Sequence, residues 1–307
     1  MRNYGVDVSK DTLDIACEGR VVRIANDKRE IKTFLKKMPS GSLVALEATN
    51  IYHLTMADAC FAAGMQVYVV NPRITRHYRE VRSLRGHNDR MDALTLAAFI
   101  EREYSQLRPY EPKSSDIRRL QTLIRRRSKL VGIKTQLRHS LQGIADLKEE
   151  FNAIIKHLDE LITKIEMLID KQLEGDQDRK RLEGIPGVGP VVSAALLSDL
   201  KAAEFARADS LVAFYGLDPK PNQSGKYNGK RKISKQGQKL GRTLLYNAAM
   251  AAVTTALWAP IYQHYLDHGW SKVQALVIIA RKIARTAWSM YRYKTTFNPN
   301  RLRGALT

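Results

Sequence analysis

The stretch NYGVDVSKDTLDIACEGRVVRI, residues 3–24, holds three short runs rich in β-branched residues, and turn-forming residues separate these runs. Short runs of this kind between turn residues are typical of β-strands. Two later runs, LVALE and QVYVV, have the same character. We therefore predict strands over residues 3–8, 12–17, 20–24, 43–47 and 66–70.

Helical patterns fill the gaps between the later strands. Apolar residues recur at helical spacing over residues 28–37, 52–63 and 89–104. Three strands followed by alternating helices and strands favour a mixed sheet flanked by helices. We therefore expect residues 1–108 to form an α/β domain with an RNase H-like fold.

The strand signals stop after Pro109, and residues 116–172 have the pattern of two long helices with Gly143 near their junction. The second helix carries a narrow apolar stripe made of Leu158, Leu161, Ile165, Leu168 and Ile169. A narrow stripe favours a single partner helix, as in a helical hairpin or a coiled coil. Periodicity does not distinguish a partner in the same chain from one in a second subunit. We assign residues 109–180 to this basic helical region.

The charged, breaker-rich segment 175–181 predicts the next boundary, and a mostly helical domain is expected over 181–307. The sequence GIPGVG at 184–189 is similar to a helix-hairpin-helix turn, whose backbone amides can hold a phosphate. A tight packing turn explains its glycines equally well. A polar, glycine-rich loop is expected over 224–229. Apolar helices are predicted over Leu240–Trp258 and Ser271–Tyr291.

The chain is strongly basic, with 51 Lys and Arg residues against 31 acids and a formal charge of +20. Such an excess favours a polyanionic partner. Residues 113–145 hold nine Lys or Arg and one acid, and residues 220–244 hold eight and none. Exposed surfaces usually mix both signs, so these two stretches favour nucleic acid. The predicted contacts are Arg125, Arg126, Arg127, Lys226, Lys230, Arg231, Lys232 and Lys235.

Other sites are not supported by the sequence. The N-terminus lacks the apolar core of a signal peptide, and the apolar run 247–262 is too short to span a bilayer. We therefore expect a cytosolic protein without a membrane partner. Cys17 and Cys60 fit small core residues rather than a disulfide or metal site. His264 and His268 share a helix face but lack a third zinc ligand.

Four acidic residues have an ordered placement along the predicted elements. Asp7 lies in the first strand, Glu47 ends a later strand, and Asp89 and Asp92 open a helix, where their spacing puts them on one face. Converging carboxylates repel one another, and their burial is costly unless divalent cations lie between them. Oxygen ligands select Mg²⁺ or Mn²⁺. Two such ions about 4 Å apart stabilise both oxygens of a phosphodiester displacement.

Each acid also has an ordinary structural explanation. Asp89 fits a helix N-cap with Asp92 completing the capping pattern, and Glu47 fits a plain strand end. Asp7 is harder to explain in this way, because a charged residue between two valines is disfavoured in an apolar strand. The ordered set of all four therefore favours a metal site.

Several motifs of the chain occur together in one known family. They are GVDVSKDTLDIA, ALEAT, VNP before an Arg-rich stretch, NDRMDALTLA, GIPGVGPVVSAALL, FYGLDP, QSGKYNGKRKISKQG and GRTLLYNAAM. Over nearly its whole length the chain closely resembles the insertion-sequence transposase family that includes the Piv invertases and the bridge-RNA-guided recombinases. Asn50 and Asn88 stand where the family often has Gly and Thr. Neither departure removes a carboxylate.

The resemblance implies a RuvC-like DEDD domain, in which the four acids bind Mg²⁺ or Mn²⁺, and a serine-bearing transposase domain at the C-terminus. Ser224 would be the nucleophile that forms a covalent phosphoserine with DNA. A serine in a glycine-flanked loop can present its hydroxyl, and the cations after it can stabilise charge on a phosphate. From the sequence alone a loop serine is usually a turn residue. Ser234, in KISKQG, is the main rival.

The resemblance also implies partners: donor and target DNA, a noncoding bridge RNA that pairs with both, and a homo-oligomer, a dimer or tetramer, whose subunits share the site. Such a protein would be cytoplasmic and nucleoid-associated when active. Two other functions fit parts of the sequence. A hydrolytic nuclease of the Holliday-junction type needs the metals and a water but not Ser224. A non-catalytic nucleic-acid-binding scaffold needs no Mg²⁺.

Overall fold

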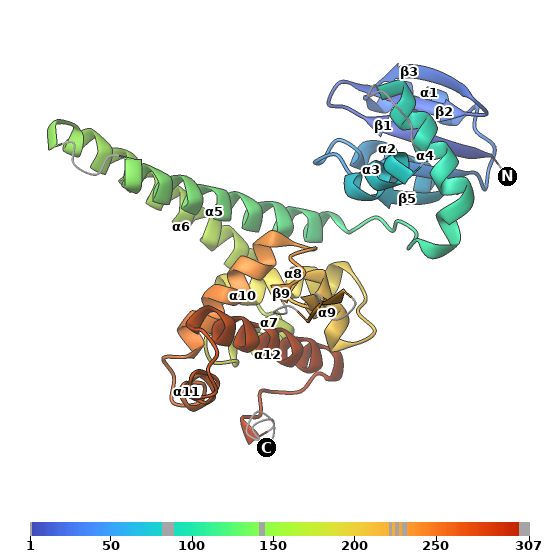
Figure 1. Cartoon of the computed structure of the whole chain (residues 1–307). Helices are drawn as coiled ribbons and strands as arrows, with labels where there is room; N and C mark the ends of the chain where they lie inside the picture. The colour runs from blue at the N-terminus through green and yellow to red at the C-terminus, as the bar shows by residue number, and fades with distance from the viewer. Residues whose placement is uncertain are drawn as a thin grey trace. The chain divides into compact units, whose positions relative to one another are not determined.

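A computed structural model describes residues 2–81, 89–140, 145–220, 223–224, 227–228 and 232–300. The chain divides into two compact units, Met1–Pro112 and Lys113–Thr307 (Figure 1). Each unit has its own hydrophobic core. Among the helices in the described ranges, none is long and apolar enough to cross a membrane.

The first unit is built on a five-stranded sheet in the order β3-β2-β1-β4-β5. Its strands are β1 (Asn3–Val8), β2 (Thr12–Cys17), β3 (Arg20–Ala25), β4 (Leu43–Glu47) and β5 (Gln66–Val70). The pairs β1–β2 and β2–β3 are antiparallel, whereas β1–β4 and β4–β5 are parallel. The predicted α/β class with a mixed sheet is confirmed, and β3 is one residue longer than predicted.

Within residues 2–81 and 89–112, four α-helices and one short 3₁₀-helix accompany the sheet. They are α1 (Lys28–Leu35), α2 (Leu54–Ala62), α3 (Pro72–Val81), α4 (Asp89–Glu103) and η1 (Tyr104–Gln106). The side chain of Asp27 caps α1 by accepting the backbone N–H groups of Arg29 and Glu30. The sequence did not predict α3. Its segment PRITRHYREV is rich in arginine, and Thr75 is its buried residue.

The helices cover the two faces of the sheet. Successive strand residues point to opposite faces. Val6 and Leu46 pack in one core with residues of α1 and α2, whereas Ala45 packs in another with Leu96 and Phe99 of α4. Figure 1 shows α4 running across the strands. The alternation therefore places Asp7 and Glu47 on the face that α4 covers.

Gly5 brings β1 and α4 into backbone contact. A Cβ atom at this position would lie 2.1 Å from the carbonyl oxygen of Ala93 and 2.2 Å from the amide nitrogen of Ala97. Any side chain would push the helix away from the strand. Because Gly5 is two residues before Asp7, this contact also fixes how close the first turn of α4 lies to the Asp7 carboxylate.

The second unit is mostly helical. Its helices are η2 (Ala145–Leu147), α5 (Ser115–Ser140), α6 (Lys148–Gln172), α7 (Gln177–Glu183), α8 (Pro190–Ala202), α9 (Ala208–Phe214), α10 (Lys239–Ala252), α11 (Ala259–Asp267) and α12 (Lys272–Tyr293). The segment 175–181, where we predict a domain boundary, contains the start of α7, which Asp176 caps. The predicted helix 240–258 is also wrong in its extent. It ends early, and Pro260 in the first turn of α11 starts another helix.

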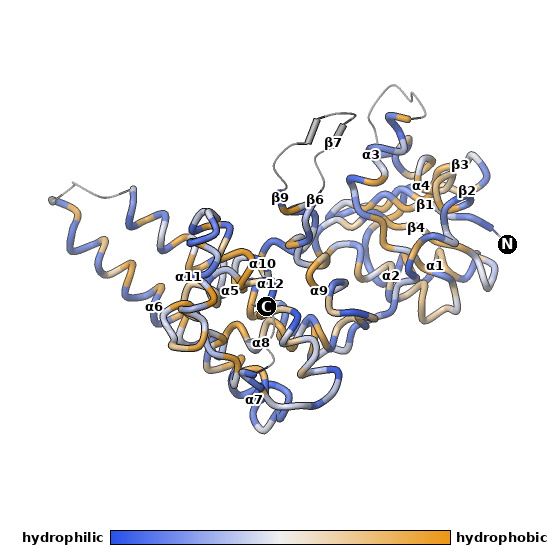
Figure 2. The backbone as a smooth tube through the Cα atoms, turned by 60° about the horizontal axis from the view of Figure 1, so that its bottom comes forward, coloured by the Kyte–Doolittle hydropathy of each residue, from blue (hydrophilic) through white to orange (hydrophobic). Residues whose placement is uncertain are grey.

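Helices α5 and α6 pack together as an intrachain hairpin, and polar and apolar residues alternate along both (Figure 2). Ile155, Ile162 and Ile169 are the buried residues of α6. The predicted apolar stripe is therefore partly wrong, since Leu161 and Leu168 are exposed. The true stripe repeats every seventh residue and is offset from the predicted one.

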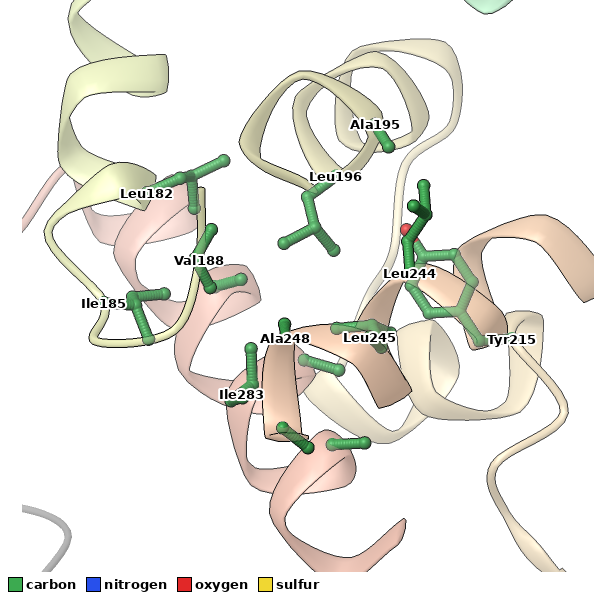
Figure 3. Packing of buried hydrophobic residues seen from close by; sticks show 14 of the residues in the cluster. Leu182, Ile185, Val188, Ala195, Leu196, Tyr215, Leu244, Leu245, Ala248 and Ile283 are labelled. Atoms are coloured by element: carbon green, nitrogen blue, oxygen red, sulfur yellow. The ribbon is translucent and has the colours of Figure 1, made fainter. Parts of the chain in front are cut away.

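The core of the second unit joins α7, α8, α10 and α12 (Figure 3). Ile185 and Val188, in the turn between α7 and α8, are buried there. A Cβ atom at Gly187 would lie 2.5 Å from the carbonyl oxygen of Ala248 and 2.6 Å from the Cβ atom of Ala252. The turn at 184–189 is therefore a packing turn against α10. Whether its amides also hold a phosphate stays a prediction.

Candidate active site

The carboxyl ends of β1 and β4 lie side by side because the two strands are parallel. Val6 is paired with Leu46, so Asp7 and Glu47 follow at the same edge of the sheet. Both side chains are half-buried. On the other side of β1, Asp7 is paired with Asp14 of the antiparallel strand β2.

The first turn of α4 adds the other two acids of the predicted set. Burial and, after it, the charges of Glu47, Asp92 and Asp89 together raise the pKa of Asp7 to about 6. Of the four predicted acids, Asp7 and Asp89 offer oxygens within 4.8 Å of each other, and Glu47 and Asp92 lie near enough for their charges to act on Asp7. They come from two strands and one helix.

Glu47 has a specific neutral partner. Burial raises the pKa of Glu47, the nearby Asp92 charge acts in the same direction, and the Thr75 hydroxyl opposes both by donating a hydrogen bond of 3.2 Å to Oε2 of Glu47. Thr75 is buried and lies on α3. The helix that the sequence did not predict therefore orients one of the acids.

Two arginines neutralise part of the acid cluster. Arg23 on β3 donates to Asp14 through Nε and Nη2, and its Nη2 also donates to Oδ2 of Asp89 at 3.0 Å. Arg79 on α3 forms an ion pair with Asp92. Arg79 and Asp92 are mostly buried, whereas the Arg23 and Asp89 side chains are 57% and 60% exposed.

Sequence reasoning missed Asp14. It is a buried acid in β2, with 5% exposure, and it faces Asp7 across the strand pair. The signal was present in the sequence TLDIAC, because an acid inside an apolar strand is as unusual there as Asp7 is in its own strand. Arg23 and Arg79 gave no such signal, because basic residues are frequent throughout the chain.

The donors of the cluster fit a divalent cation. Asp7, Asp14 and Asp89 each offer one carboxylate oxygen, and these three oxygens lie within 4.8 Å of one another. All are hard oxygen ligands of the kind that Mg²⁺ and Mn²⁺ prefer. A bound cation would also offset the repulsion that helps to raise the pKa of Asp7.

The second predicted centre lies on a pair of short β-ribbons. The pairs are β6 (Pro219–Lys220) with β9 (Lys232–Ile233) and β7 (Gln223–Ser224) with β8 (Tyr227–Asn228). The backbone of Ser224 is paired with Tyr227. Its side chain is outside the described part of the structure, as are Lys226, Lys230 and Arg231. Lys232 and Lys235 are exposed.

Ser234 has a structural partner at the base of these ribbons. Its hydroxyl donates a hydrogen bond of 2.6 Å to Oδ1 of Asp218, and its amide donates to the carbonyl of the same residue at 2.8 Å. It also accepts the amide N–H of Gln236. These contacts close the segment 219–233 at its ends, which explains Ser234 without a catalytic role.

The predicted arginine contacts on α5 differ from one another. Arg125 and Arg126 are exposed. Arg127 is half-buried, and its Nε donates to Oε1 of Glu166 on α6 at 2.8 Å. Arg127 therefore helps to hold the helical hairpin together.

Comparison with known proteins identifies the family. The family model described as "Transposase", of the DEDD type found in IS110, matches residues 4–162, which is more than half of the chain. The model described as "Transposase IS116/IS110/IS902 family" matches residues 179–264. The first match contains the acid cluster, and the second contains the β-ribbons.

Several individual proteins are similar over most of their length. A probable family 20 transposase of Pseudomonas aeruginosa is 24% identical and covers 97% of this chain and 99% of its own. The pilin gene-inverting protein of Moraxella bovis is 27% identical over 82% of this chain and 81% of its own. The transposase for insertion sequence element IS1111A of Coxiella burnetii is 24% identical over 95% and 90%. The chain therefore belongs to the IS110/IS116/IS902 family of insertion-sequence transposases and recombinases.

Proposed function

We propose that the chain cuts and rejoins DNA strands through Mg²⁺ or Mn²⁺ held by the acid cluster and through a covalent phosphoserine at Ser224. The observation that carries the proposal is the convergence of Asp7, Glu47, Asp89 and Asp92 at one edge of the sheet. Membership of a transposase family makes DNA the substrate of choice. The one-signed basic stretches support the same class of partner.

We also propose that the first unit has an RNase H-like, RuvC-like fold. The strand order β3-β2-β1-β4-β5, antiparallel in its first three strands and parallel in the rest, supports this assignment. The domain limits 1–108, 109–180 and 181–307 remain our proposal. The first of these limits lies close to the end of the first compact unit at Pro112.

In the acid cluster, the residues of this chain hold and orient the donors. A bound divalent cation would polarise the scissile phosphate and stabilise the developing charge on its oxygens. Asp7 and Glu47 supply donors from rigid strands, and Asp89 and Asp92 supply them from the helix. Thr75 and Arg79 orient Glu47 and Asp92 through their hydrogen bonds. Rigid placement of this kind keeps the donors in position before DNA binds.

At Ser224, the serine Oγ would form a new bond to phosphorus while one P–O ester bond of the DNA breaks. The serine proton passes to solvent, and the leaving oxygen takes up a proton. One phosphodiester is exchanged for another, so rejoining needs no external energy source. The lysines and arginines around the ribbons would hold the phosphate during both steps.

The remaining partners follow from the same proposal. We propose donor and target DNA, a noncoding bridge RNA, and a homo-oligomer that assembles in the cytoplasm at the nucleoid. Base pairing to a guide would leave the protein to bind mostly backbone phosphates, which suits a basic surface. The exposed Leu161 and Leu168 on α6 support subunit association.

The test is incubation of the full chain with cognate element DNA, the noncoding RNA of the element and Mg²⁺, followed by denaturing electrophoresis. The wild type should carry DNA attached to protein, and Ser224→Ala should lose this adduct while still binding DNA. Ser234→Ala is the matched control and should keep the adduct. Nicked DNA without any adduct would support a hydrolytic nuclease instead. Binding without Mg²⁺-dependent chemistry would support a scaffold.

A further inference from the structure

Arg23 occupies the outer side of the acid cluster. Its Nη2 atom lies 2.8 Å from Oδ2 of Asp14 and 3.0 Å from Oδ2 of Asp89. One guanidinium nitrogen therefore bridges an acid of β2 and an acid of α4. Both acids belong to the group whose oxygens lie within 4.8 Å of one another.

A divalent cation cannot share this space with the guanidinium. Mg²⁺ holds its oxygen ligands at about 2.1 Å, so oxygens bound to one ion lie roughly 3 to 4 Å apart. The Nη2 atom is within hydrogen-bond distance of one oxygen of Asp14 and one oxygen of Asp89, so it already occupies the place next to both. Two cations between the same oxygens would also repel each other.

The two contacts of Arg23 differ in strength. Asp14 is 5% exposed and accepts hydrogen bonds from both Nε and Nη2 of Arg23. The two residues therefore form a bidentate ion pair with fixed geometry. The contact with Asp89 is a single hydrogen bond between two side chains that are more than half exposed. Exposed ion pairs of this kind contribute little to the stability of the fold. The exposed Asp89 side chain can therefore turn away from Arg23 while Arg23 stays bound to Asp14.

We propose that Arg23 is a resident counter-ion that competes with the divalent cation for Asp89, and that Asp14 anchors Arg23 rather than binding the ion. The inference rests on the proposed function in one respect, namely that the acid cluster binds a cation. It adds a regulatory feature to that site. The cluster is partly neutralised when no cation is bound, and the cation enters by displacing Arg23 from Asp89.

The second arginine marks which side of the cluster opens. Arg79 and Asp92 are 12% and 21% exposed, so their ion pair is shielded from solvent. A shielded pair is harder to separate than an exposed one, because its charges would be left in a less polar environment. The exchange of arginine for cation therefore takes place at Asp89, not at Asp92.

The test is Mn²⁺ binding to the full chain without nucleic acid, measured by the electron paramagnetic resonance signal of free Mn²⁺. Arg23→Gln removes the competing charge and should bind Mn²⁺ about threefold to tenfold more tightly than the wild type. Arg20→Gln is the matched control. Arg20 is exposed on the same strand about 10 Å from Arg23, so its loss should leave the affinity unchanged.

Arg23→Gln leaves Asp14 buried without its partner, and this variant can lose stability. The double variant Asp14→Asn/Arg23→Gln removes both charges and avoids that problem. If Asp14 is the anchor, the double variant should bind Mn²⁺ more tightly than both the wild type and Asp14→Asn. Binding weaker than the wild type would make Asp14 a ligand and overturn the anchor role.

Failure of this inference differs from failure of the proposed function. Wild-type binding of Mn²⁺ with no gain in either Arg23 variant would overturn the competition and leave the metal site intact. Absence of Mn²⁺ binding in the wild type and in all variants would overturn both.

Discussion

Asp7 in the first unit and Asp199 in the second show two ways of raising the pKa of a carboxyl group to about 6. At Asp7 the effect of burial is increased by three other acids, Glu47, Asp92 and Asp89. At Asp199 burial also dominates, but the neighbours act in the opposite direction, since hydrogen bonds from Tyr215 and Gln238 lower the pKa.

The surroundings of Asp199 explain why it needs no cation. The Tyr215 hydroxyl donates to its Oδ2 at 3.1 Å, and the side-chain amides of Gln121 and Gln238 donate to its Oδ1 at 3.2 and 3.1 Å. These donors join α5, α8 and the start of α10. A satisfied buried carboxyl holds helices together, whereas converging carboxyls repel one another and can be stabilised by a cation. A raised pKa alone therefore does not identify a reactive site.

The largest expected effect is the difference in DNA strand cleavage between a variant of Asp7 and a variant of Asp199. Asp7→Asn should lower DNA strand cleavage by at least about 100-fold, because it removes a donor to the proposed cation. Asp199→Asn should stay within about tenfold of the wild type, since the amide oxygen can still accept from Gln121 and Gln238 while the amide nitrogen donates to the Tyr215 oxygen. The measurement is single-turnover cleavage of element DNA at saturating Mg²⁺. Near-wild-type cleavage by Asp7→Asn would contradict the distinction between Asp7 as a reactive acid and Asp199 as a structural one.

The next prediction concerns the packing that creates the acid cluster. Gly5→Ala should destabilise the chain by about 3 kcal/mol or more, because the new methyl group collides with the backbone of α4 and neither element can move easily. It should also weaken Mn²⁺ binding by displacing the first turn of that helix. Gly189→Ala is the control. No described atom lies within 4 Å of a Cβ atom there, and the backbone has a φ of −85°. Equal stability of both variants would contradict the close contact.

A third prediction follows from the sign of the Asp199 shift. Its pKa rises from 3.8 to about 6 on folding, so the folded chain binds this proton more tightly than the unfolded chain. The resulting stabilisation is complete below pH 3.8 and is lost as the pH rises through about 6. The difference is on the order of 3 kcal/mol for a group that is 3% exposed.

Asp199→Asn should therefore gain stability relative to the wild type between about pH 4 and pH 7. Tryptophan fluorescence during chemical denaturation measures this selectively, because Trp258, Trp270 and Trp288 all lie in the second unit. Tyr215→Phe provides a comparison, since it removes one donor and should raise the pKa of Asp199 further. A stability difference that is constant with pH would contradict the assignment.

The sequence predicted the sheet and the four acids because both depend on local pattern. Strands that alternate and acids inside apolar runs remain visible in a single sequence. Asp14, like Asp7, is an acid inside an apolar strand. It was missed because the sequence prediction rested on the ordered set of a strand Asp, a strand Glu and two helix Asp residues, which does not include it. Helix α3 was missed because it is short and its apolar residues at helical spacing are only Ile74, Tyr78 and Val81, which stand among many charged residues. Within the fold it packs against α4.

The arginine partners could not be predicted for a physical reason. Arg23 and Asp89 are 66 residues apart, and Arg127 and Glu166 are 39 apart. Such pairs depend on tertiary packing. A run of basic residues in the sequence does not show which of its arginines will have an acidic partner. The register of α6 was missed for a related reason. Helix α6 has apolar residues at more positions than a single partner helix can cover, so which of them are buried depends on how α5 packs against it.

The smallest expected effect concerns Arg126 and Arg127, and it tests whether an arginine in an intrachain ion pair contributes less to nucleic-acid binding than an exposed neighbour. Arg126 is exposed and forms no ion pair with the described residues, whereas Arg127 is bound to Glu166. Arg126→Gln should lower the log–log salt slope of nucleic-acid binding by about 0.9 if it contacts duplex phosphate. Arg127→Gln should change the slope less and should instead loosen the α5–α6 hairpin. Fluorescence anisotropy over a range of salt concentrations measures both slopes, and circular dichroism measures the helical stability. A larger slope change for Arg127 than for Arg126 would mean that the Glu166 pair opens when nucleic acid binds, and that α5 presents all of its arginines to the substrate.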